Sequence, residues 1–137
     1  MLYEAEALMD QSVERISNMA NLVNLIHSHF PHHWIGFYLV VNEELQLGPF
    51  VGPVACTKIA KGKGVCGTAY ATNTTQLVDD VHQFEGHIAC SPHSKSEIVV
   101  PCSADNEVYA VLDIDSDAYA GFDKMDQVYL QQLVNLL

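Results

Sequence analysis

The sequence lacks long hydrophobic runs, has few basic residues and contains no close cysteine pair, and each absence excludes a class of protein. Its apolar runs are only a few residues long, whereas a transmembrane helix needs about 20. Six Lys and Arg stand against seventeen Asp and Glu, giving a formal charge of -11. This balance argues against nucleic acids and membranes as partners, because both favour basic surfaces. The cysteines follow no CxxC spacing, which excludes a thioredoxin-like redox motif.

No internal repeat, low-complexity tract or linker divides the chain, and residues 1–137 suit a single domain with one core. The first twenty residues are rich in charge and lack the apolar segment of a signal peptide. We therefore expect a cytoplasmic protein. In that compartment its four cysteines would be reduced thiols, metal ligands or redox-catalytic groups.

Apolar spacing predicts a helix at each end of the chain. Before Pro31, three- and four-residue spacing gives one stripe of Met9, Val13, Ile16, Ala20, Val23 and Ile26. The last helix is expected to begin at Asp123 as N-cap, with Asp126 in its first turn. Its predicted apolar side consists of Met125, Val128, Leu133, Val134 and Leu137.

Between these helices the sequence predicts hairpin-linked strands. Aromatic and β-branched residues indicate strands over residues 33–41, 45–48, 55–60, 75–78, 97–103 and 107–115. Residues 48–53 are predicted as a loop and 65–71 as a short helix. This order predicts an α+β fold, with an antiparallel sheet and the terminal helices on one of its faces.

Strand alternation predicts which side chains share a face. On the first strand Trp34, Gly36 and Tyr38 point one way, and Ile35, Phe37 and Leu39 point toward the helices. The gap at Gly36 indicates either room for a small ligand or a close backbone approach. The sequence leaves these two alternatives open.

The last two strands predict a cluster of carboxylates. One face of the last strand carries Tyr109, Val111, Asp113 and Asp115, opposite Val108, Ala110, Leu112 and Ile114. Glu97 can share the face of the two aspartates, while Cys102 is predicted to be a core thiol. A bound cation, a metal or a shared proton would offset the repulsion among the acids. The alternative, a strand end emerging into solvent, accounts for Asp115 more easily than for Asp113.

Cys90 lies in a polar loop between His87 and the pair His93 and Lys95, where a thiol can become nucleophilic. Cys56 and Cys66 could resolve an oxidised Cys90 if the fold brings them near. Zinc is a rival interpretation, because the same loop offers His82, His87, Cys90 and His93. Their spacing matches no paired zinc knuckle, so we predict no metal site.

Several runs together carry a family resemblance: WIGFYLV, LGPFVGPVACTKIAKGKGVCGTA, TQLVDDVHQFEGHIAC, SKSEIVVP and VLDIDSD. From about Trp34 to the end of the last helix, the chain resembles the free methionine-(R)-sulfoxide reductases, catalytic members of the GAF-domain superfamily. The resemblance implies a GAF-like antiparallel sheet, with terminal helices on one face and a ligand pocket on the other.

The resemblance also implies a reaction. Free L-methionine-(R)-sulfoxide would be reduced to methionine without a metal or organic cofactor. Cys90 matches the nucleophile that becomes a sulfenic acid, Cys56 the main resolving thiol and Cys66 a third thiol that assists recycling. Thioredoxin would then reduce the disulfide. The implied substrate site comprises the aromatic wall of Trp34 and Tyr38 and the acids Glu97, Asp113 and Asp115.

Two features leave alternatives open. A non-catalytic sensor domain of the same fold would bind a small molecule without needing Cys56, Cys66 and Cys90 together. Ser91 follows the expected nucleophile, where the family often has an acidic residue. The oligomeric state also stays open, with a homodimer among the alternatives.

Overall fold

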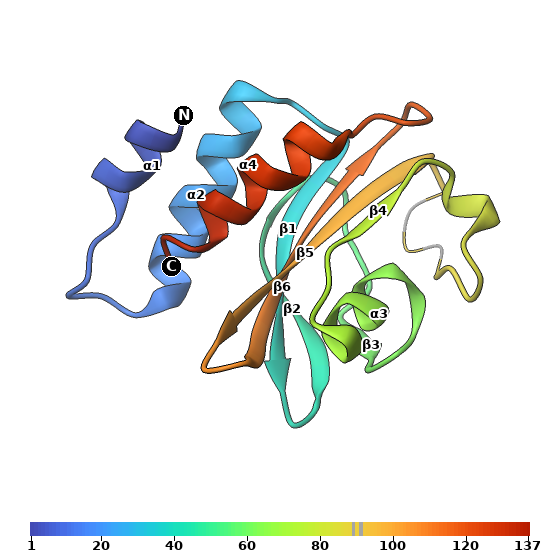
Figure 1. Ribbon diagram of the computed structural model, residues 1–137, viewed down its shortest axis with the longest axis horizontal. Helices are drawn as coiled ribbons and strands as arrows, with labels where there is room; N and C mark the ends of the chain where they lie inside the picture. The colour runs from blue at the N-terminus through green and yellow to red at the C-terminus, as the bar shows by residue number, and fades with distance from the viewer. Residues whose placement is uncertain (89, 91) are drawn as a thin grey trace.

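A six-stranded antiparallel sheet forms the centre of the structure, a computed structural model that describes residues 1–88, 90 and 92–137 (Figure 1). The strands follow the spatial order β3 (Lys58–Ala60), β2 (Glu44–Val51), β1 (Trp34–Val41), β6 (Glu107–Ser116), β5 (Ser96–Ala104) and β4 (Gln76–Val78). The long strands β1, β6 and β5 therefore lie side by side in the middle, and short strands close both edges.

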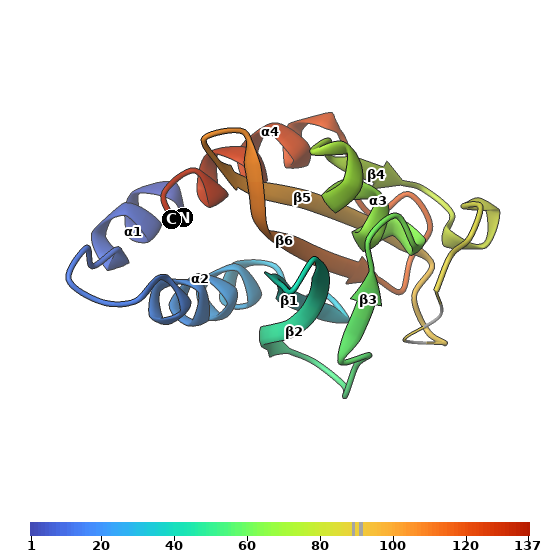
Figure 2. The same ribbon diagram turned by 90° about the horizontal axis from the view of Figure 1, so that it is seen from below.

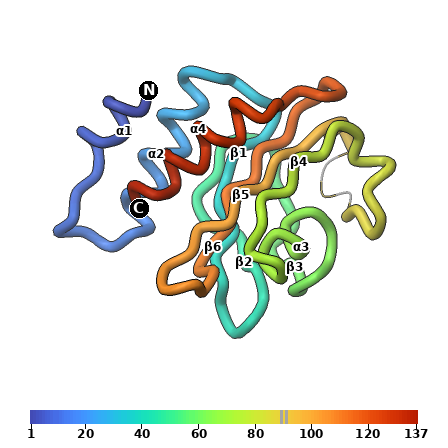
Figure 3. The backbone as a smooth tube through the Cα atoms, in the orientation of Figure 1, coloured from blue at the N-terminus to red at the C-terminus, as the bar shows by residue number. Residues whose placement is uncertain are grey.

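Helices cover the two faces of the sheet unequally. The helices α1 (Leu2–Leu8), α2 (Arg15–His29) and α4 (Lys124–Val134) lie on one face, with the two chain termini near each other (Figures 1 and 2). The short helix α3 (Gly64–Thr72) packs on the opposite face, and the 3-10 helix η1 (Val81–Gln83) follows β4. The smooth backbone trace shows the chain passing from β4 through η1 into a long loop before it returns as β5 (Figure 3).

Two apolar clusters confirm the predicted alternation on the central strands. Ile35 and Phe37 belong to the cluster under α2 and α4, together with Ile98, Val100 and Cys102 of β5. Trp34, Tyr38, Val99 and Val111 belong to the cluster under α3. The α+β fold with terminal helices on one face is thus as predicted, and the other face is free to build a site.

The first helix prediction is wrong in one respect, because the segment forms two helices. Met9 and Val13 lie outside both helices, and Val13 and Ile16 are 42% and 48% exposed. The break is stabilised by Asp10, whose side chain accepts hydrogen bonds from the Ser12 amide and hydroxyl. The buried Asn18 side chain also bonds the Asp10 amide and carbonyl. A local polar turn thus overrides the apolar spacing.

Residues 48–51 were predicted as a loop, but they extend β2. Phe50 and Val51 pair with Gly36 and Ile35 of β1, with a register irregularity between Gly36 and Tyr38. Pairing with a central strand compensates for the weak strand preference of Gly48 and Pro49. The next strand, β3, is shorter than predicted, since only Lys58–Ala60 pairs with β2.

An irregularity between β5 and β6 overturns two predicted facings, those of Val108 and Tyr109. The register shifts between Cys102, which pairs with Ala110, and Ser103, which pairs with Val108, so Tyr109 is the extra residue. Tyr109 consequently packs with the helix-side cluster, where Arg15 stacks 3.7 Å from its ring centre, and Val108 packs on the other side. A bulge reverses alternation locally, which explains the error.

The C-terminal helix begins as predicted. Asp123 accepts a hydrogen bond from the Asp126 amide, and the Asp126 side chain bonds the Asp123 amide in return, which forms a capping box. The predicted apolar side is only partly correct, since Met125 and Val128 are 81% and 56% exposed. Leu130, Leu133 and Val134 supply the buried side.

Among the residues that the structure describes, no helix has the length and hydropathy required to cross a bilayer.

The cap gives a stability prediction. Replacing Asp123 by Ala removes the acceptor for the Asp126 amide and should lower the free energy of unfolding by about 1 kcal/mol in urea denaturation. Asp123→Ser keeps a side-chain acceptor and serves as the control, with a much smaller expected loss. Equal losses in the two variants would contradict the capping explanation.

Candidate active site

A disulfide joins two of the predicted cysteines across the sheet face that carries α3. Cys56 lies in the segment between β2 and β3, and Cys90 lies in the loop between η1 and β5. The residues are 34 positions apart, with their Cα atoms 5.5 Å from each other. Both are partly exposed. The fold thus places Cys56 where it can pair with Cys90, while Cys66 and Cys102 remain free thiols.

The aromatic residues of β1 hold the segment that carries Cys56. Trp34 and Tyr38 are 3% and 2% exposed, and their ring centres lie 5.8 Å apart in a stacked arrangement. Trp34 Nε1 donates a hydrogen bond to the Pro53 carbonyl at 3.0 Å, and the Tyr38 hydroxyl donates to the Cys56 carbonyl at 2.9 Å. Burial raises the pKa of Tyr38, so its hydroxyl remains a donor. The aromatic wall therefore also fixes the backbone on both sides of Val54.

The structure decides between the two interpretations of Gly36. A Cβ atom built there would lie 2.5 Å from Cη2 of Trp34 and 2.5 Å from Cβ of Phe50. The Trp34 ring therefore lies over Gly36. The space left by the missing side chain is filled by Trp34 and Phe50 and not by a ligand. The ligand space must lie elsewhere along the same face.

Three carboxylates come together on β5 and β6, as the alternation predicted. Glu97 pairs directly with Asp115, while Asp113 pairs with Gly36 across β1. Glu97 and Asp113 are 6% and 5% exposed, and Asp115 is half-buried. Because Asp113 is buried, the alternative of a strand end in solvent is wrong for this residue. Like charges opposite each other on a sheet destabilise it, so the cluster costs stability.

Burial and mutual repulsion determine how these acids hold protons. Burial raises the pKa of Glu97 well above its usual range, and repulsion by Asp113 and Asp115 raises it further. Burial likewise raises the pKa of both aspartates, although hydrogen bonds with Glu97 oppose that rise. Because the pKa of Asp115 is also raised well above its usual range, these directions favour a proton held within the cluster, with Glu97 among the acids that can keep it. Asp113 Oδ1 is buried without a hydrogen-bond partner among the described residues.

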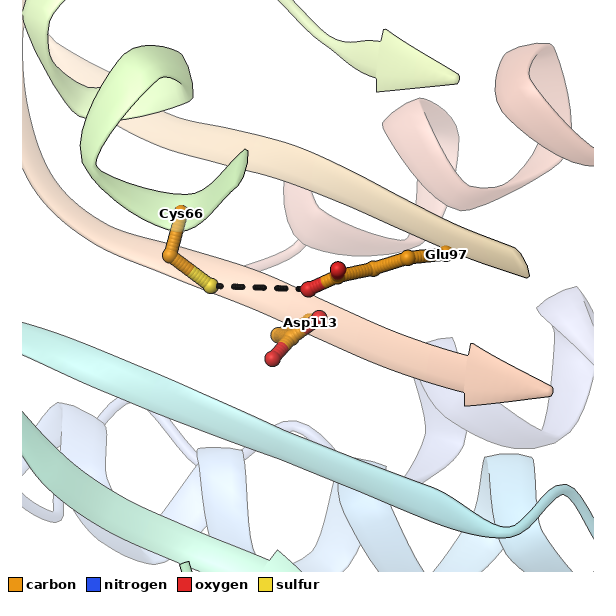
Figure 4. A group of neighbouring side chains, drawn as sticks. All are labelled: Cys66, Glu97 and Asp113. Carbon is orange, nitrogen blue, oxygen red and sulfur yellow. Dashed lines mark hydrogen bonds between the residues drawn. The ribbon is translucent and has the colours of Figure 1, made fainter. Parts of the chain in front are cut away.

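Cys66, at the start of α3, points its thiol into the acid cluster (Figure 4). Its Sγ donates a hydrogen bond to Glu97 Oε1 at 3.9 Å. The sulfur of Cys66 and one carboxylate oxygen each of Glu97 and Asp113 lie within 4.8 Å of one another. Burial and then the nearby carboxylates raise the pKa of this thiol well above its usual range. Cys66 therefore stays protonated beside the acids, where it is a poor nucleophile.

The zinc interpretation of the Cys90 loop finds no support in this arrangement. Within the described part of the chain, the one group of three potential metal ligands is Cys66, Glu97 and Asp113, and not the histidines. The Cys90 sulfur is occupied by its bond to Cys56.

Two polar residues join the site in ways that the sequence did not predict. The sequence predicts His87 as a cationic neighbour of Cys90, but its Nε2 lies 4.0 Å from Glu97 Oε2, and burial lowers its pKa. Ser94 is 5% exposed, and its side-chain hydrogen bond to Asp115 lowers the pKa of that carboxyl. Loop residues carry no periodicity, so only their position before β5 could have drawn attention to them.

These groups line a cavity of about 40 Å³, which is bounded by the acids Glu97, Asp113 and Asp115 and by Trp34, Tyr38, Ile59 and Cys90. This volume is room for about three water molecules. The site thus combines a sulfur, an aromatic wall and partly protonated carboxylates. Ser91, the departure beside Cys90, lies outside the described residues, as does Ala89 of the same run.

Comparisons with known proteins identify the family of the chain. Residues 10–137 match the GAF domain family. The chain is 48% identical over its full length to GAF domain-containing protein A of Dictyostelium discoideum, covering 87% of that protein. It is 45% identical to free methionine-R-sulfoxide reductase of Escherichia coli, over 93% of this chain and 78% of the relative.

A solved structure gives the same result at the level of the fold. Free methionine-R-sulfoxide reductase from Neisseria meningitidis, solved in complex with its substrate, superposes with a TM-score of 0.95 and 43% identity. The match covers 98% of this chain and 82% of that one.

The buried acids predict an unusual dependence of stability on pH. A carboxyl whose pKa is raised on folding stabilises the fold below its unfolded pKa, and this stability is lost as the pH rises through the folded value. Asp113→Asn removes one such group, so the variant should be more stable than the wild type near neutral pH. The gain should be about 1.4 kcal/mol for each unit of raised pKa, and should vanish near about pH 4.

Urea denaturation at the two pH values measures this difference. Glu107→Gln, at an exposed position of the same strand, is the control and should leave the pH dependence unchanged. A stability difference for Asp113→Asn that is independent of pH would contradict the explanation from buried charge.

Proposed function

The chain belongs to the GAF domain family and, within it, to the free methionine-R-sulfoxide reductases, and from this premise we propose that it reduces free L-methionine-(R)-sulfoxide to L-methionine through Cys90. The observation that carries the proposal is the Cys56–Cys90 disulfide, whose Cys90 lines the same pocket as the three acids. Such a pair is the expected product of a sulfenic acid resolved by a neighbouring thiol. The alternative, a sensor domain of the same fold, has no use for this arrangement.

The chemistry begins with the sulfoxide oxygen. A sulfoxide is a poor electrophile until its oxygen is protonated or strongly hydrogen-bonded, so the site needs an acid that is protonated near neutral pH. Glu97 meets that need because burial and the two aspartates raise its pKa. In our proposal Glu97 donates its proton to the sulfoxide oxygen while the Cys90 sulfur attacks the sulfoxide sulfur.

The remaining acids supply selectivity for the free amino acid. In our proposal Asp113 carries the negative charge of the pocket, because hydrogen bonds with Glu97 and Cys66 oppose the rise of its pKa. Its buried Oδ1 lacks a partner among the described residues. An ammonium group would satisfy that oxygen and offset the repulsion of the acids. Methionine within a peptide has no such ammonium. The stacked rings of Trp34 and Tyr38 offer an apolar surface for the methyl and thioether groups.

The cycle closes through the two cysteines. The oxygen of the sulfoxide is transferred to the Cys90 sulfur. This transfer releases methionine and converts Cys90 to a sulfenic acid. The Cys56 thiol then attacks this sulfur, forms the disulfide and releases water. Thioredoxin, oxidised to its own disulfide, supplies the two electrons that restore both thiols. No metal or organic cofactor takes part, and the cytoplasm, whose thioredoxin pool is reducing, is the proposed compartment.

The disulfide-bonded pocket is small for this substrate. Its cavity of about 40 Å³ has room for a few waters. We infer that methionine sulfoxide enters when the Cys56–Cys90 bond is reduced and the two loops are free to separate.

The surroundings of Cys66 favour a role other than recycling. Its protonated thiol donates to Glu97, the proposed proton donor, at 3.9 Å. We propose that Cys66 chiefly orients that carboxyl, and its participation in recycling stays a prediction.

An activity assay tests the function. With thioredoxin, thioredoxin reductase and NADPH, the protein should turn over the free R-sulfoxide and leave the S-sulfoxide and a peptide sulfoxide almost unchanged. Cys90→Ser should abolish turnover, and Cys56→Ser should release about one methionine per chain before stopping, because the sulfenic acid lacks its resolving thiol. Cys102→Ser, at a buried thiol on the helix side, is the matched control and should keep activity. Equal turnover of both epimers, or full turnover without Cys90, would falsify the assignment, and binding without turnover would favour the sensor alternative.

A second experiment tests the proton donor. Glu97→Gln keeps the shape of the side chain but cannot supply a proton, so kcat should fall by about 10²- to 10⁴-fold, the usual contribution of a general acid. Quenching of the fluorescence of Trp34, the single tryptophan, reports whether substrate still binds. Full activity in Glu97→Gln would exclude Glu97 as the essential donor.

A further inference from the structure

One exposed apolar residue stands beside the disulfide. Val54 is 90% exposed, the highest value among the large exposed apolar residues of the described chain. It lies two positions from Cys56, and Ile88, 38% exposed, lies two positions from Cys90. An isolated exposed valine is ordinary. Its position at a bond that an outside reductant must reach is what gives it significance.

The backbone holds Val54 outward. The carbonyls of Pro53 and Cys56, on either side of Val54, accept hydrogen bonds from the buried side chains of Trp34 and Tyr38 at 3.0 and 2.9 Å. Gly52 begins the segment with a φ of 139°, a conformation that side-chain-bearing residues rarely adopt. The exposure of Val54 therefore belongs to a segment fixed at both ends.

The same segment differs in charge from the rest of the molecule. Residues 52–64 contain Lys58, Lys61 and Lys63 and no carboxylate, whereas the whole chain has only six basic residues and a formal charge of -11. The three lysines are exposed, and the Lys58 side chain retains 68% of its accessible surface next to its Glu44 contact. Of the three, Lys63 lines the same pocket as Val54 and Ile88. An apolar centre with a polar rim is the usual anatomy of a protein interface.

The two sulfurs of the disulfide differ in their position relative to the pocket. Cys90 lines the pocket together with Val54, Lys63 and Ile88, whereas Cys56 does not belong to the pocket lining. Cys56 is therefore the sulfur that lies outside the substrate pocket. Attack there leaves Cys90 as the departing thiolate, directed toward the substrate site.

We propose that Val54, Ile88, Lys58, Lys61 and Lys63, here called the Val54 surface, dock an acidic dithiol protein that attacks Cys56. This inference rests on the proposed function and names the surface that its electron donor uses. The partner's first thiolate bonds to Cys56 Sγ and expels Cys90 as thiolate, which takes up a proton. The partner's second thiol then forms the partner's own disulfide and frees Cys56. Two electrons pass from partner to enzyme, and both protein thiols are restored.

Comparison of two reductants tests the docking. Turnover of the R-sulfoxide is measured with dithiothreitol, which needs no docking surface, and with thioredoxin as the acidic dithiol protein. The quantity compared is the ratio of kcat/KM for thioredoxin to the rate with dithiothreitol, so that effects on shared steps cancel. Val54→Glu should lower this ratio about tenfold, since a charge at the apolar centre of an interface is strongly disfavoured. Val128→Glu, at an exposed valine of α4 on the opposite face, is the matched control and should leave it unchanged.

Charge is tested in the same way. Lys58→Glu should lower the ratio, and Lys124→Glu, at an exposed lysine on α4, should not. Added salt should reduce turnover with thioredoxin more than turnover with dithiothreitol, because steering by exposed charges is screened. A thioredoxin variant lacking its second cysteine should be trapped as a mixed disulfide, and peptide mass spectrometry should locate the bond at Cys56.

The outcomes separate the two proposals. No R-sulfoxide turnover with dithiothreitol in the wild type would overturn the proposed function. Normal turnover with dithiothreitol, but an equal ratio in Val54→Glu and Val128→Glu, would overturn only the docking surface. A mixed disulfide at Cys90 would overturn the order of attack.

Discussion

The burial of three carboxylates in one pocket is the constraint on which the rest of the site depends. Glu97, Asp113 and Asp115 repel one another away from water, and each has a raised pKa because of burial. This arrangement is tolerable only when at least one acid keeps a proton and the neighbours donate hydrogen bonds. Cys66 and Ser94 provide such bonds from α3 and from the loop before β5. The site therefore opposes stability in a way that a bound ammonium would relieve, as functional sites often do.

The sheet makes this cluster possible because its central strands are covered on both faces. The face under α2 and α4 holds the large apolar cluster, which supplies most of the burial. The other face is free to carry polar groups beneath the short helix α3. The aromatic residues there act twice, since Trp34 and Tyr38 form the apolar wall and also bind the carbonyls that position Cys56. A change in this wall would thus alter both the pocket and the redox pair.

Much of the fold was predictable from the sequence, and the errors have local physical causes. The faces of β1 and β5 followed from alternation, which holds wherever pairing is regular. Tyr109 was misplaced because a bulge inserts one residue into β6, and bulges leave little trace in composition. Residues 48–51 and the break at Asp10 were misjudged because pairing with β1 and a polar turn outweighed local preferences.

The sequence by itself determined the family and the candidate residues: three cysteines other than Cys102, two aromatics at alternate positions, and acids on two strands. It could do so because residue types and short spacings can be read directly from the linear sequence. Only the tertiary structure decided that Cys66 lies among the carboxylates, that Trp34 covers Gly36, and that His87 approaches Glu97. These relations join residues from separate loops and strands, and their distances depend on how the elements pack, which no local pattern encodes.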